Sequence, residues 1–251
     1  MDHAIYTAMG AASQTLEQQA ITANNLANSS TPGFRAQIAA MRAVPVEGPS
    51  LATRTLVVAS TPGADTTQGP LNYTSRSLDV AVQGEGWLAV QLPDGGEAYT
   101  RNGAIQVNAD GQMQIQGYPV VGDGGPLEVP VNASISIAAD GTVSSLGNGD
   151  DPNTIGPVGR LKLISATDQQ LVRGDDGLFH AAATADQAAG AVLPQDDAVQ
   201  VMSGVLEGSN VNTAQTLVDM INNSRRFEMQ MKVISNADDN AQSANQLLSI
   251  S

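Results

Sequence analysis

The residues that could carry out chemistry are few, and they do not form a recognisable constellation. The chain has no cysteine, which excludes thiol catalysis, disulfide frameworks and cysteine-ligated zinc or iron–sulfur sites. Its two histidines, His3 and His180, are too few for a multi-histidine metal site. No serine lies in a G-x-S-x-G pattern, the local signature of a hydrolase nucleophile. The side chains therefore indicate no catalytic residues, no cofactor and no metal, and the chain is predicted not to be an enzyme.

Short motifs rich in glycine and aspartate are better explained as turns than as ligand sites. The segment 84–86 begins a G-x-G pattern, but Ala89 stands where the third glycine would be and a strand-like sequence follows. The Asp-Gly pairs at 110–111 and 140–141 lack the spacing of a calcium loop. The paired aspartates 150–151 and 175–176 lie beside proline or glycine, as is typical of exposed turns.

The charge balance excludes two further classes of partner. The formal net charge is −14, from 25 acidic and 11 basic residues. Nucleic acids and anionic membranes both require clustered lysine and arginine, so neither is expected as a partner. Arg225-Arg226 is the only adjacent basic pair, and we interpret it as a local ion-pair site; His180 is interpreted as a packed or surface histidine. No apolar run reaches the roughly 18 residues of a membrane helix.

The N-terminal part of the chain predicts one long helix. From Asp2 to about Asn28 there is no proline and only one glycine, and apolar residues recur at steps of three and four. The sequence 29–33, Ser-Ser-Thr-Pro-Gly, should end this helix because proline disfavours helical geometry at the residue before it. Replacing Pro32 and Gly33 by alanine is therefore expected to extend the helix at little cost to either part. The predicted packing face is Ile5, Met9, Ala12, Leu16, Ala20, Ala23 and Ala27.

The C-terminal part predicts a second long helix. Thr213 to about Ser249 contains neither proline nor glycine, and Asn210 and Asn212 are candidate N-caps. A stripe with alternating steps of three and four is apolar at most of its positions, which is typical of a narrow coiled-coil seam. The stripe is Leu217, Met220, Ser224, Phe227, Met231, Ile234, Asp238, Ala241, Asn245 and Leu248.

The middle of the chain predicts an antiparallel β domain, because turn signals recur every 8–12 residues. Asn102-Gly103 is predicted to be a hairpin turn, residues 160–164 one strand, and residues 147–159 a surface loop. The predicted fold class is α+β: long terminal helices pair as an α-helical coiled coil, with an inserted, mainly antiparallel β domain. Four divisions are predicted: an N-terminal helix at 1–28, a hinge and extended linker at 29–70, the outer β domain at 71–205 and the C-terminal helix at 206–251. The linker is expected to contain one strand, near 54–59.

Three ordered motifs resemble those of bacterial flagellar rod and hook proteins. Residues 23–35 (ANNLANSSTPGFR) are similar to the family pattern A-N-N-[LI]-A-N-x-x-T-x-G-[FY]-[KR]. Residues 78–88 (LDVAVQGEGWL), followed by 99–103 (YTRNG), resemble the central motif of the family. Residues 206–212 (LEGSNVN) and the helix after them resemble the C-terminal motif. These matches cover both ends and the middle of the chain.

The resemblance assigns roles to particular positions. The family signature and hinge would be Asn24, Asn25, Leu26, Asn28, Thr31, Pro32, Gly33 and Phe34. The assembly interface of the N-terminal helix would be its predicted packing face. The assembly interface of the C-terminal helix would be Leu217, Met220, Ile221, Phe227, Met231, Ile234, Ala241 and Leu248. The length leaves no room for the outer domains of hook proteins, and the start at residues 1–6 resembles that of the proximal rod subunit adjoining the distal rod.

The resemblance implies a structural subunit of the flagellar basal-body rod, which polymerises helically into the periplasm-spanning drive shaft that transmits motor torque for motility. The expected partners are the chain itself, other proximal and distal rod subunits and the flagellar type III export apparatus, with no nucleic acid and no direct membrane span. The N-terminus lacks the pattern of a cleaved signal peptide, which agrees with such export. The alternatives are a distal rod subunit, a secreted β-rich adhesin or sugar-binding module, for which the aromatic residues are few, and a hydrolase, which lacks a nucleophile.

Overall fold

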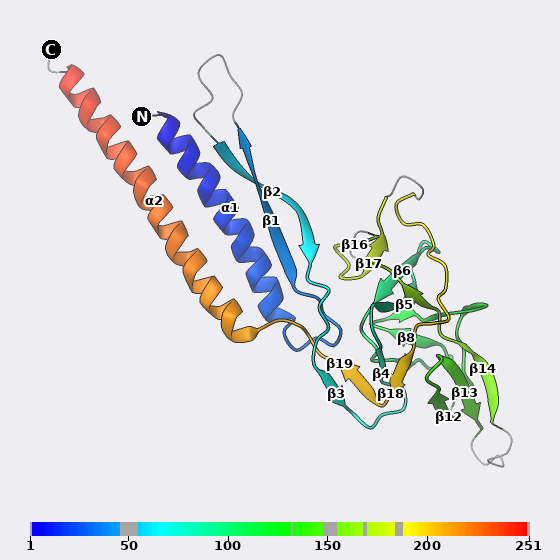
Figure 1. The fold of residues 1–251 in the computed structure, drawn as a ribbon. Helices are drawn as coiled ribbons and strands as arrows, with labels where there is room; N and C mark the ends of the chain where they lie inside the picture. Colours follow the sequence, from blue (N-terminus) through cyan, green and yellow to red (C-terminus); the bar gives the residue numbers. More distant parts are fainter. Residues whose placement is uncertain are drawn as a thin grey trace. The chain divides into compact units, whose positions relative to one another are not determined.

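The computed structural model describes residues 2–45, 55–131, 133–147, 155–167, 170–183 and 188–249. The chain divides into two compact units (Figure 1). The helical unit comprises Met1–Ser29, Gln37–Gly63 and Val211–Ser251, and the β unit comprises Ser30–Ala36 and Ala64–Asn210. The chain therefore crosses between the units after residues 29, 36, 63 and 210. In the described part of the chain, no helix has the length and apolar character needed to cross a membrane.

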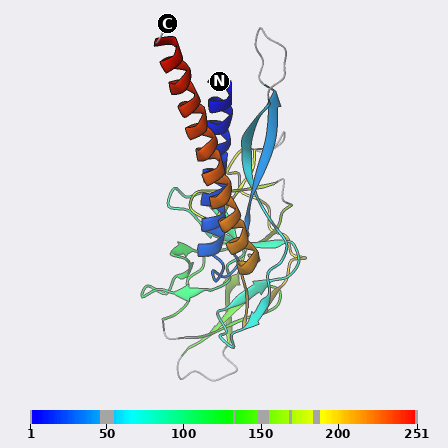
Figure 2. The same ribbon diagram turned by 90° about the vertical axis from the view of Figure 1, so that its left-hand side faces the viewer.

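Two long helices form the helical unit, as the sequence predicts. Helix α1 spans Asp2–Ala27 and helix α2 spans Thr213–Ser249. The two pack side by side in both ribbon views (Figures 1 and 2). Strands β1 (Gln37–Pro45) and β2 (Thr55–Ala64) form a two-stranded sheet, and β1 contacts α1. The described part of the strand predicted near 54–59 lies in β2.

The seam between α1 and α2 combines polar side chains with apolar ones. The Thr15 hydroxyl lies 3.1 Å from Gln230 Oε1, and Asn223 Nδ2 donates to Thr22 Oγ1 at 3.4 Å. Buried and half-buried side chains recur at steps of four and three on both helices, the spacing that coiled-coil seams use. On α1 they are Ala8, Ala12, Thr15, Gln19, Thr22 and Leu26. On α2 they are Thr216, Met220, Asn223, Phe227, Gln230 and Ile234.

The β unit is built from several small sheets, and every described strand pair in it is antiparallel, as the sequence predicts. The largest sheet has the order β15-β5-β6-β17-β16. Its strands are β5 (Gly86–Gln91), β6 (Glu97–Thr100), β15 (Leu163–Ser165), β16 (Leu171–Arg173) and β17 (Phe179–Ala181). Two three-stranded sheets and one hairpin adjoin it. Their strands are β7 (Gln106–Val107), β8 (Met113–Ile115) and β9 (Tyr118–Pro119); β12 (Ser134–Ile137), β13 (Thr142–Leu146) and β14 (Gly156–Arg160); and β10 (Val121–Gly122) with β11 (Gly125–Pro126).

The strands through which the chain begins and completes the β unit pair with each other. Strand β3 (Leu71–Tyr73) pairs with β19 (Val205–Glu207), and β4 (Val80–Val82) pairs with β18 (Val201–Ser203). This arrangement places the beginning and the end of the inserted unit side by side, although most of its sequence lies between them.

Strand β5 is buried on both faces and divides the core. Leu88 and Val90 belong to a large aliphatic cluster on one face. Trp87 and Ala89 belong to a second cluster on the other face, where the Trp87 ring lies 4.5 Å from that of Phe179, centroid to centroid. The only tryptophan of the chain therefore reports on the core of the β unit alone.

Two local sequence predictions in the β unit are wrong. Asn102-Gly103 is not a hairpin turn: β6 pairs with β5 and β17, and residue 104 bridges to Asp79. Glycine is needed at 103 because a Cβ there would lie 1.6 Å from the Val80 carbonyl oxygen. The predicted strand 160–164 is divided between β14 and β15, which belong to different sheets. The predicted loop 147–159 overlaps β14, and its residues 148–154 lie outside the described part.

Candidate functional site

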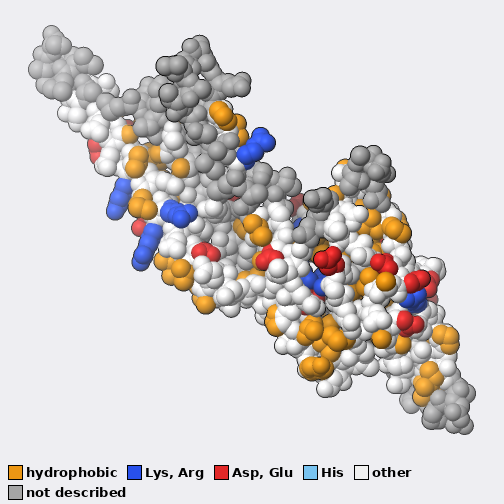
Figure 3. Space-filling view, in the orientation of Figure 1, with side chains coloured by type: hydrophobic (Ala, Val, Ile, Leu, Met, Phe, Trp, Pro, Cys, Tyr) orange, Lys and Arg blue, Asp and Glu red, His pale blue; other side chains and the backbone are white. Residues whose placement is uncertain are grey.

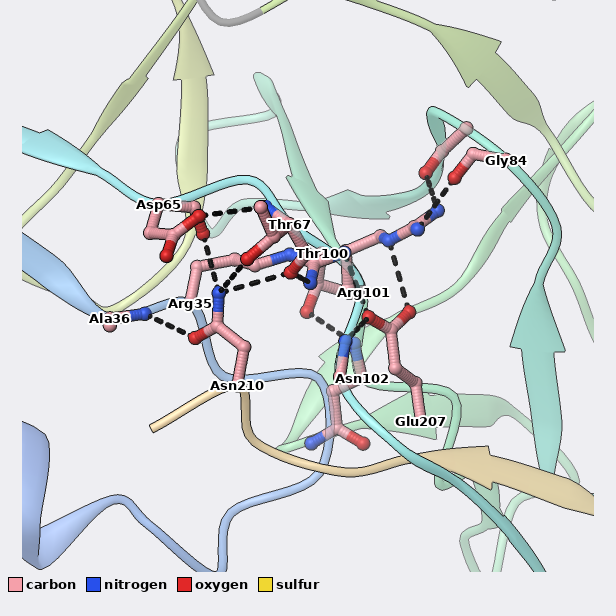
Figure 4. A network of polar contacts seen from close by, with 12 residues as sticks. Arg35, Ala36, Asp65, Thr67, Gly84, Thr100, Arg101, Asn102, Glu207 and Asn210 are labelled. Atoms are coloured by element: carbon pink, nitrogen blue, oxygen red, sulfur yellow. Dashed lines mark hydrogen bonds and ion pairs between the residues drawn. The ribbon is translucent and has the colours of Figure 1, made fainter. Parts of the chain in front are cut away.

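A buried carboxylate, Glu207, joins distant segments of the β unit (Figure 4). Arg35 Nη2 lies 2.8 Å from Glu207 Oε1, and Arg101 Nε lies 3.2 Å from Oε2. The Gly69 amide donates to Oε1 at 3.0 Å. All three charged side chains are almost fully excluded from solvent. Charges at such sites are tolerated only when they are paired and hydrogen-bonded, so these segments depend on one another.

The cluster carries more positive than negative charge. Arg101 donates through Nη2 to the Gly84 carbonyl at 2.7 Å and through Nη1 to the Gly86 carbonyl. Its Nε contact with Glu207 is a charge contact without the direction of an aligned hydrogen bond. Burial lowers the pKa of Arg101 to about 10; the charge of Arg35 acts in the same direction, and Glu207 opposes both. Glu207 is thus the shared counter-charge of two buried cations, Arg35 and Arg101.

Gly33, in the predicted hinge, fits against this cluster. Its amide donates to the Glu207 carbonyl at 2.8 Å. Its φ is +66°, and a Cβ would lie 2.3 Å from the backbone of Arg101 and Asn102. The expectation that Pro32 and Gly33 could become alanine at little cost is therefore wrong, because neither the backbone conformation nor the space at 33 accepts a side chain.

The residue after the glycine, Phe34, is buried beneath an arginine. The Arg173 guanidinium lies 4.4 Å from the Phe34 ring centroid, a cation–π distance, and its Nη1 donates to the Arg35 carbonyl at 2.9 Å. Burial lowers the pKa of Arg173, and nearby Asp176 opposes this shift. Arg173 therefore holds the end of the first motif through both the Phe34 ring and the Arg35 carbonyl.

The two asparagines predicted as N-caps have different roles. Asn212 caps α2, because its Oδ1 accepts the Gln215 amide at 3.1 Å. Asn210 does not cap the helix. Its Oδ1 accepts the Ala36 amide at 2.7 Å, and its Nδ2 donates to the carbonyls of Asp65 and Thr67 at 2.8 and 3.0 Å. Asn210 is therefore a cross-link between segments of the β unit.

In the helical unit, the signature residue Asn25 makes a paired contact with Gln37. The Gln37 amide donates to Asn25 Oδ1 at 2.8 Å, and Asn25 Nδ2 donates to the Gln37 carbonyl at 3.0 Å. The Asn24 carbonyl accepts both the backbone amide and the Nδ2 of Asn28, and the Leu26 carbonyl accepts from Ser29, so these bonds end the helix. In the β unit, the Thr31 carbonyl accepts the Phe34 amide.

The structure divides the predicted N-terminal interface between two faces of α1. Ala12 is buried in the seam and Ile5 is half-buried. The other members are exposed: Met9, Leu16, Ala20, Ala23 and Ala27. Met9 is 55% and Leu16 54% exposed, and Tyr6, which the prediction omits, is also exposed. Within one chain these apolar side chains remain exposed although α1 and α2 have paired.

The predicted C-terminal interface is divided in the same way. Met220, Phe227, Ile234 and Ala241 are half-buried, whereas Leu217, Ile221 and Met231 are about half exposed. The side chain of Leu248 lies outside the described part. Orange apolar and blue basic side chains lie next to one another on the exposed surface of the helical unit in Figure 3. Val218, Met229 and Val233 add to the exposed apolar residues of α2.

The remaining candidate groups form no catalytic site among the described residues. Residues 84–85 form a turn that leads into β5, and segments 110–111 and 140–141 lie in turns, as predicted. His180 in β17 has Asp176 as its side-chain partner, with Nε2 3.0 Å from Oδ2, and the described residues hold no cluster of potential metal ligands. Among the described residues Arg225 and Arg226 show no ion pair, so the interpretation of a local ion-pair site stays a prediction. Arg226 lines a cavity of about 340 Å³ between α1, β1 and α2.

The sequence prediction missed four residues of the buried network: Arg35, Arg101, Glu207 and Asn210. Each lies inside one of the three motifs, so the motifs marked the segments. Their pairing could not be read from the sequence, because charged residues are usually exposed and nothing in a single sequence indicates which distant charges meet.

The comparisons with known proteins agree with these motifs. Three family models match: "Flagella basal body rod protein" at 5–35, "Flagellar hook protein FlgE/F/G D1 domain" at 81–145 and "Flagellar basal body rod FlgEFG protein C-terminal" at 202–247. The flagellar basal-body rod proteins FlgF of Escherichia coli K12 and Salmonella typhimurium LT2 are 66% and 65% identical over all 251 residues, with both chains fully covered. The FlgG of Agrobacterium fabrum is 32% identical over 94% of each chain. These names describe rod proteins rather than enzymes, in agreement with the prediction. The chain belongs to the family of flagellar basal-body rod proteins.

Proposed function

We propose that this chain is a structural subunit of the proximal rod and polymerises helically through its terminal helices. The observation that carries the proposal is the set of apolar side chains left exposed after α1 and α2 have paired. On α1 these include Tyr6, Met9 and Leu16, and on α2 Leu217, Val218 and Ile221. Exposed apolar side chains that recur along a helix in this way are typical of an interaction surface.

The exposed residues have the spacing that a packed helix needs. On α1, exposed positions follow steps of four and three from Tyr6 to Ala27, parallel to the seam residues but on the other side of the helix. Each terminal helix therefore offers one face to its partner in the chain and another to neighbouring subunits. We propose that these faces complete a coiled coil in the rod. Contacts that join different surfaces of successive subunits, without closing a ring, generate a helical filament.

The sequence identities favour the proximal rod over the distal rod. The compared relatives named FlgF from Escherichia coli and Salmonella are 66% and 65% identical to the chain, whereas those named FlgG are at most 35% identical. In this role the subunit would contact itself and other rod proteins in the periplasm and pass torque from the motor. It would reach the rod through the flagellar type III export apparatus without a cleaved signal peptide.

The test is complementation of a motile bacterium whose own FlgF gene has been deleted. The wild-type chain should restore rods and swimming. The double variant Met9→Gln, Ile221→Gln removes apolar surface from exposed positions of both helices, so the purified subunit should keep its helix content and its Trp87 fluorescence. It should nevertheless fail to build rods, as seen by electron microscopy of basal bodies.

The matched control is Asn240→Gln, at an exposed polar position of α2, and it should swim normally. Failure of the wild-type chain to restore any swimming would overturn the proposed function. Normal rods in the double variant would instead show that the outward helix faces do not carry assembly.

A further inference from the structure

A small cavity inside the β unit lies against two buried arginines. Its volume is about 50 Å³, and Arg35 and Arg101, whose side chains are 1% and 2% exposed, both line it. One water molecule needs roughly 10–15 Å³ of such space, so the cavity has room for a few waters or for one small ion. The cavity is also lined by Thr66, Glu85, Trp87 and Ala166, and every one of these residues belongs to the β unit.

The buried charge beside this cavity is not balanced. Arg35 and Arg101 share one buried carboxylate, that of Glu207. Burial lowers the pKa of Arg101 to about 10, so the guanidinium still carries its proton at pH 7. The three groups therefore leave one excess positive charge. A charge that is shielded from water requires a counter-charge or hydrogen-bond partners that compensate it.

Arg101 also has a donor that no acceptor takes up among the described residues. A guanidinium has five N–H donors. Arg101 gives one to the Gly84 carbonyl and one to the Gly86 carbonyl, whereas its Nε has no aligned acceptor in the described part of the chain (Figure 4). Anions accept hydrogen bonds from guanidinium groups, and such charge-assisted bonds are among the strongest in proteins.

One carboxylate, that of Glu85, lines the cavity and opposes an anion there. Glu85 is an exposed residue in the turn before β5, so water and salt screen its charge. The charges of the two buried arginines are screened much less. The cavity therefore favours an anion, and it should do so more strongly when the Glu85 charge is removed.

We propose that this cavity binds one small monovalent anion, of the size and charge of chloride, against Arg35 and Arg101. A single excess positive charge matches a monovalent anion better than the doubly charged sulfate. The bound anion would stabilise the β unit, because it would lie against an arginine from the first sequence motif and one from the central motif. The site is a property of the single subunit and does not depend on the proposed function.

Trp87 makes this binding measurable, because the only tryptophan of the chain lines the cavity and is itself 4% exposed. The purified full chain is titrated with sodium iodide, and sodium gluconate, whose anion is too large for the cavity, keeps the ionic strength constant. Iodide quenches indole fluorescence on contact. Quenching should follow a saturating curve, and added chloride should relieve it by competition. Quenching that rises linearly with iodide and ignores chloride would overturn the proposal.

Glu85→Gln and its matched control Glu128→Gln show whether the anion lies in this cavity. Both remove an exposed carboxylate from the β unit, but only Glu85 lines the cavity. The dissociation constant for chloride, obtained from the competition, should fall at least about threefold in Glu85→Gln and stay at the wild-type value in Glu128→Gln. Equal constants in the two variants would mean that the anion binds elsewhere, and would reject the site.

Urea unfolding covers the case in which iodide is too large for the cavity. An anion that binds only the folded chain raises the unfolding midpoint. When chloride replaces gluconate at constant ionic strength, the midpoint followed by Trp87 fluorescence should rise, and it should rise further in Glu85→Gln than in Glu128→Gln. If iodide does not quench, this measurement decides: the expected rise supports the site, and equal midpoints in chloride and gluconate reject it.

Discussion

Arg35 and Glu207 form an ion pair inside the β unit, with Nη2 of the arginine 2.8 Å from Oε1 of the glutamate and both side chains at most 1% exposed. The arginine is the last residue of the first sequence motif, and the glutamate is the second residue of the third. The pair therefore ties the segment that follows α1 to the segment that precedes α2. Arg101, from the central motif, completes the cluster on the other carboxylate oxygen.

Glu207→Gln should strongly destabilise the β unit. The substitution keeps the shape of the side chain but leaves Arg35 and Arg101 buried without a counter-charge. Removing one partner of a buried ion pair costs about 3–5 kcal/mol, so the free energy of unfolding should fall by roughly that amount. Urea unfolding followed by Trp87 fluorescence measures it. Glu128→Gln, at an exposed position, should change stability little, and a loss below about 1 kcal/mol in Glu207→Gln would contradict the prediction.

Gly33→Ala should destabilise the β unit by more than about 1 kcal/mol, because the new Cβ would be forced against the backbone of Arg101 at an unfavourable φ. Gly124→Ala is the control, since a Cβ at 124 meets nothing within 4 Å and its φ is not in the left-handed region. The same fluorescence assay compares them. Equal unfolding midpoints for the two variants would show that the segment around 33 relaxes freely.

Phe227→Ala should weaken the helix pair, whereas Leu217→Ala should not. Phe227 is half-buried near the α1 residues Thr15 and Gln19, so truncation should cost about 1–3 kcal/mol, less than at a fully buried site. Leu217 is 48% exposed. Thermal unfolding of the free subunit followed by circular dichroism at a helix-sensitive wavelength distinguishes them. A larger loss for Leu217→Ala would show that the helices pair through a different face.

The free energy of unfolding of the β unit should fall as the pH rises above 10, because the buried Tyr99 hydroxyl resists ionisation in the folded chain. Burial raises the pKa of Tyr99 to about 12, and its hydroxyl oxygen accepts the Leu193 amide at 2.7 Å. Between about pH 10 and 12 the unfolded chain loses the phenolic proton while the folded chain retains it. The stabilisation is therefore complete below pH 10 and lost as the pH rises through 12.

The measurement for Tyr99 is the free energy of unfolding between pH 9 and 12, compared with Tyr99→Phe. The phenylalanine variant should lose the part of the pH dependence that belongs to this residue. Tyr73, which is exposed, provides the control through Tyr73→Phe. Identical pH dependences in the wild type and Tyr99→Phe would reject the prediction.

Several elements could be predicted because their signals are local. A long run without proline or glycine sets the extent of α2, and Pro32 limits α1. Turns at the Asp-Gly pairs follow from the conformational freedom of glycine, which has φ of +84° at Gly111 and +85° at Gly141. The hairpin predicted at Asn102-Gly103 failed because Gly103 serves close packing against Val80 rather than a turn.

The sequence by itself determined that both ends are helices with a repeat of three and four residues, that the middle is antiparallel β, and that the chain resembles flagellar rod proteins. Only the tertiary structure decided which helix face lies inside the subunit. The large apolar residues Met9 and Leu16 remain about half exposed, whereas Ala12 and Thr15 are buried in the seam. Periodicity shows that a helix has a face to bury, but the face that the other helix contacts depends on side chains of both helices, which meet only in the folded chain. The roles of Glu207 and Asn210 likewise depend on segments brought together only by folding.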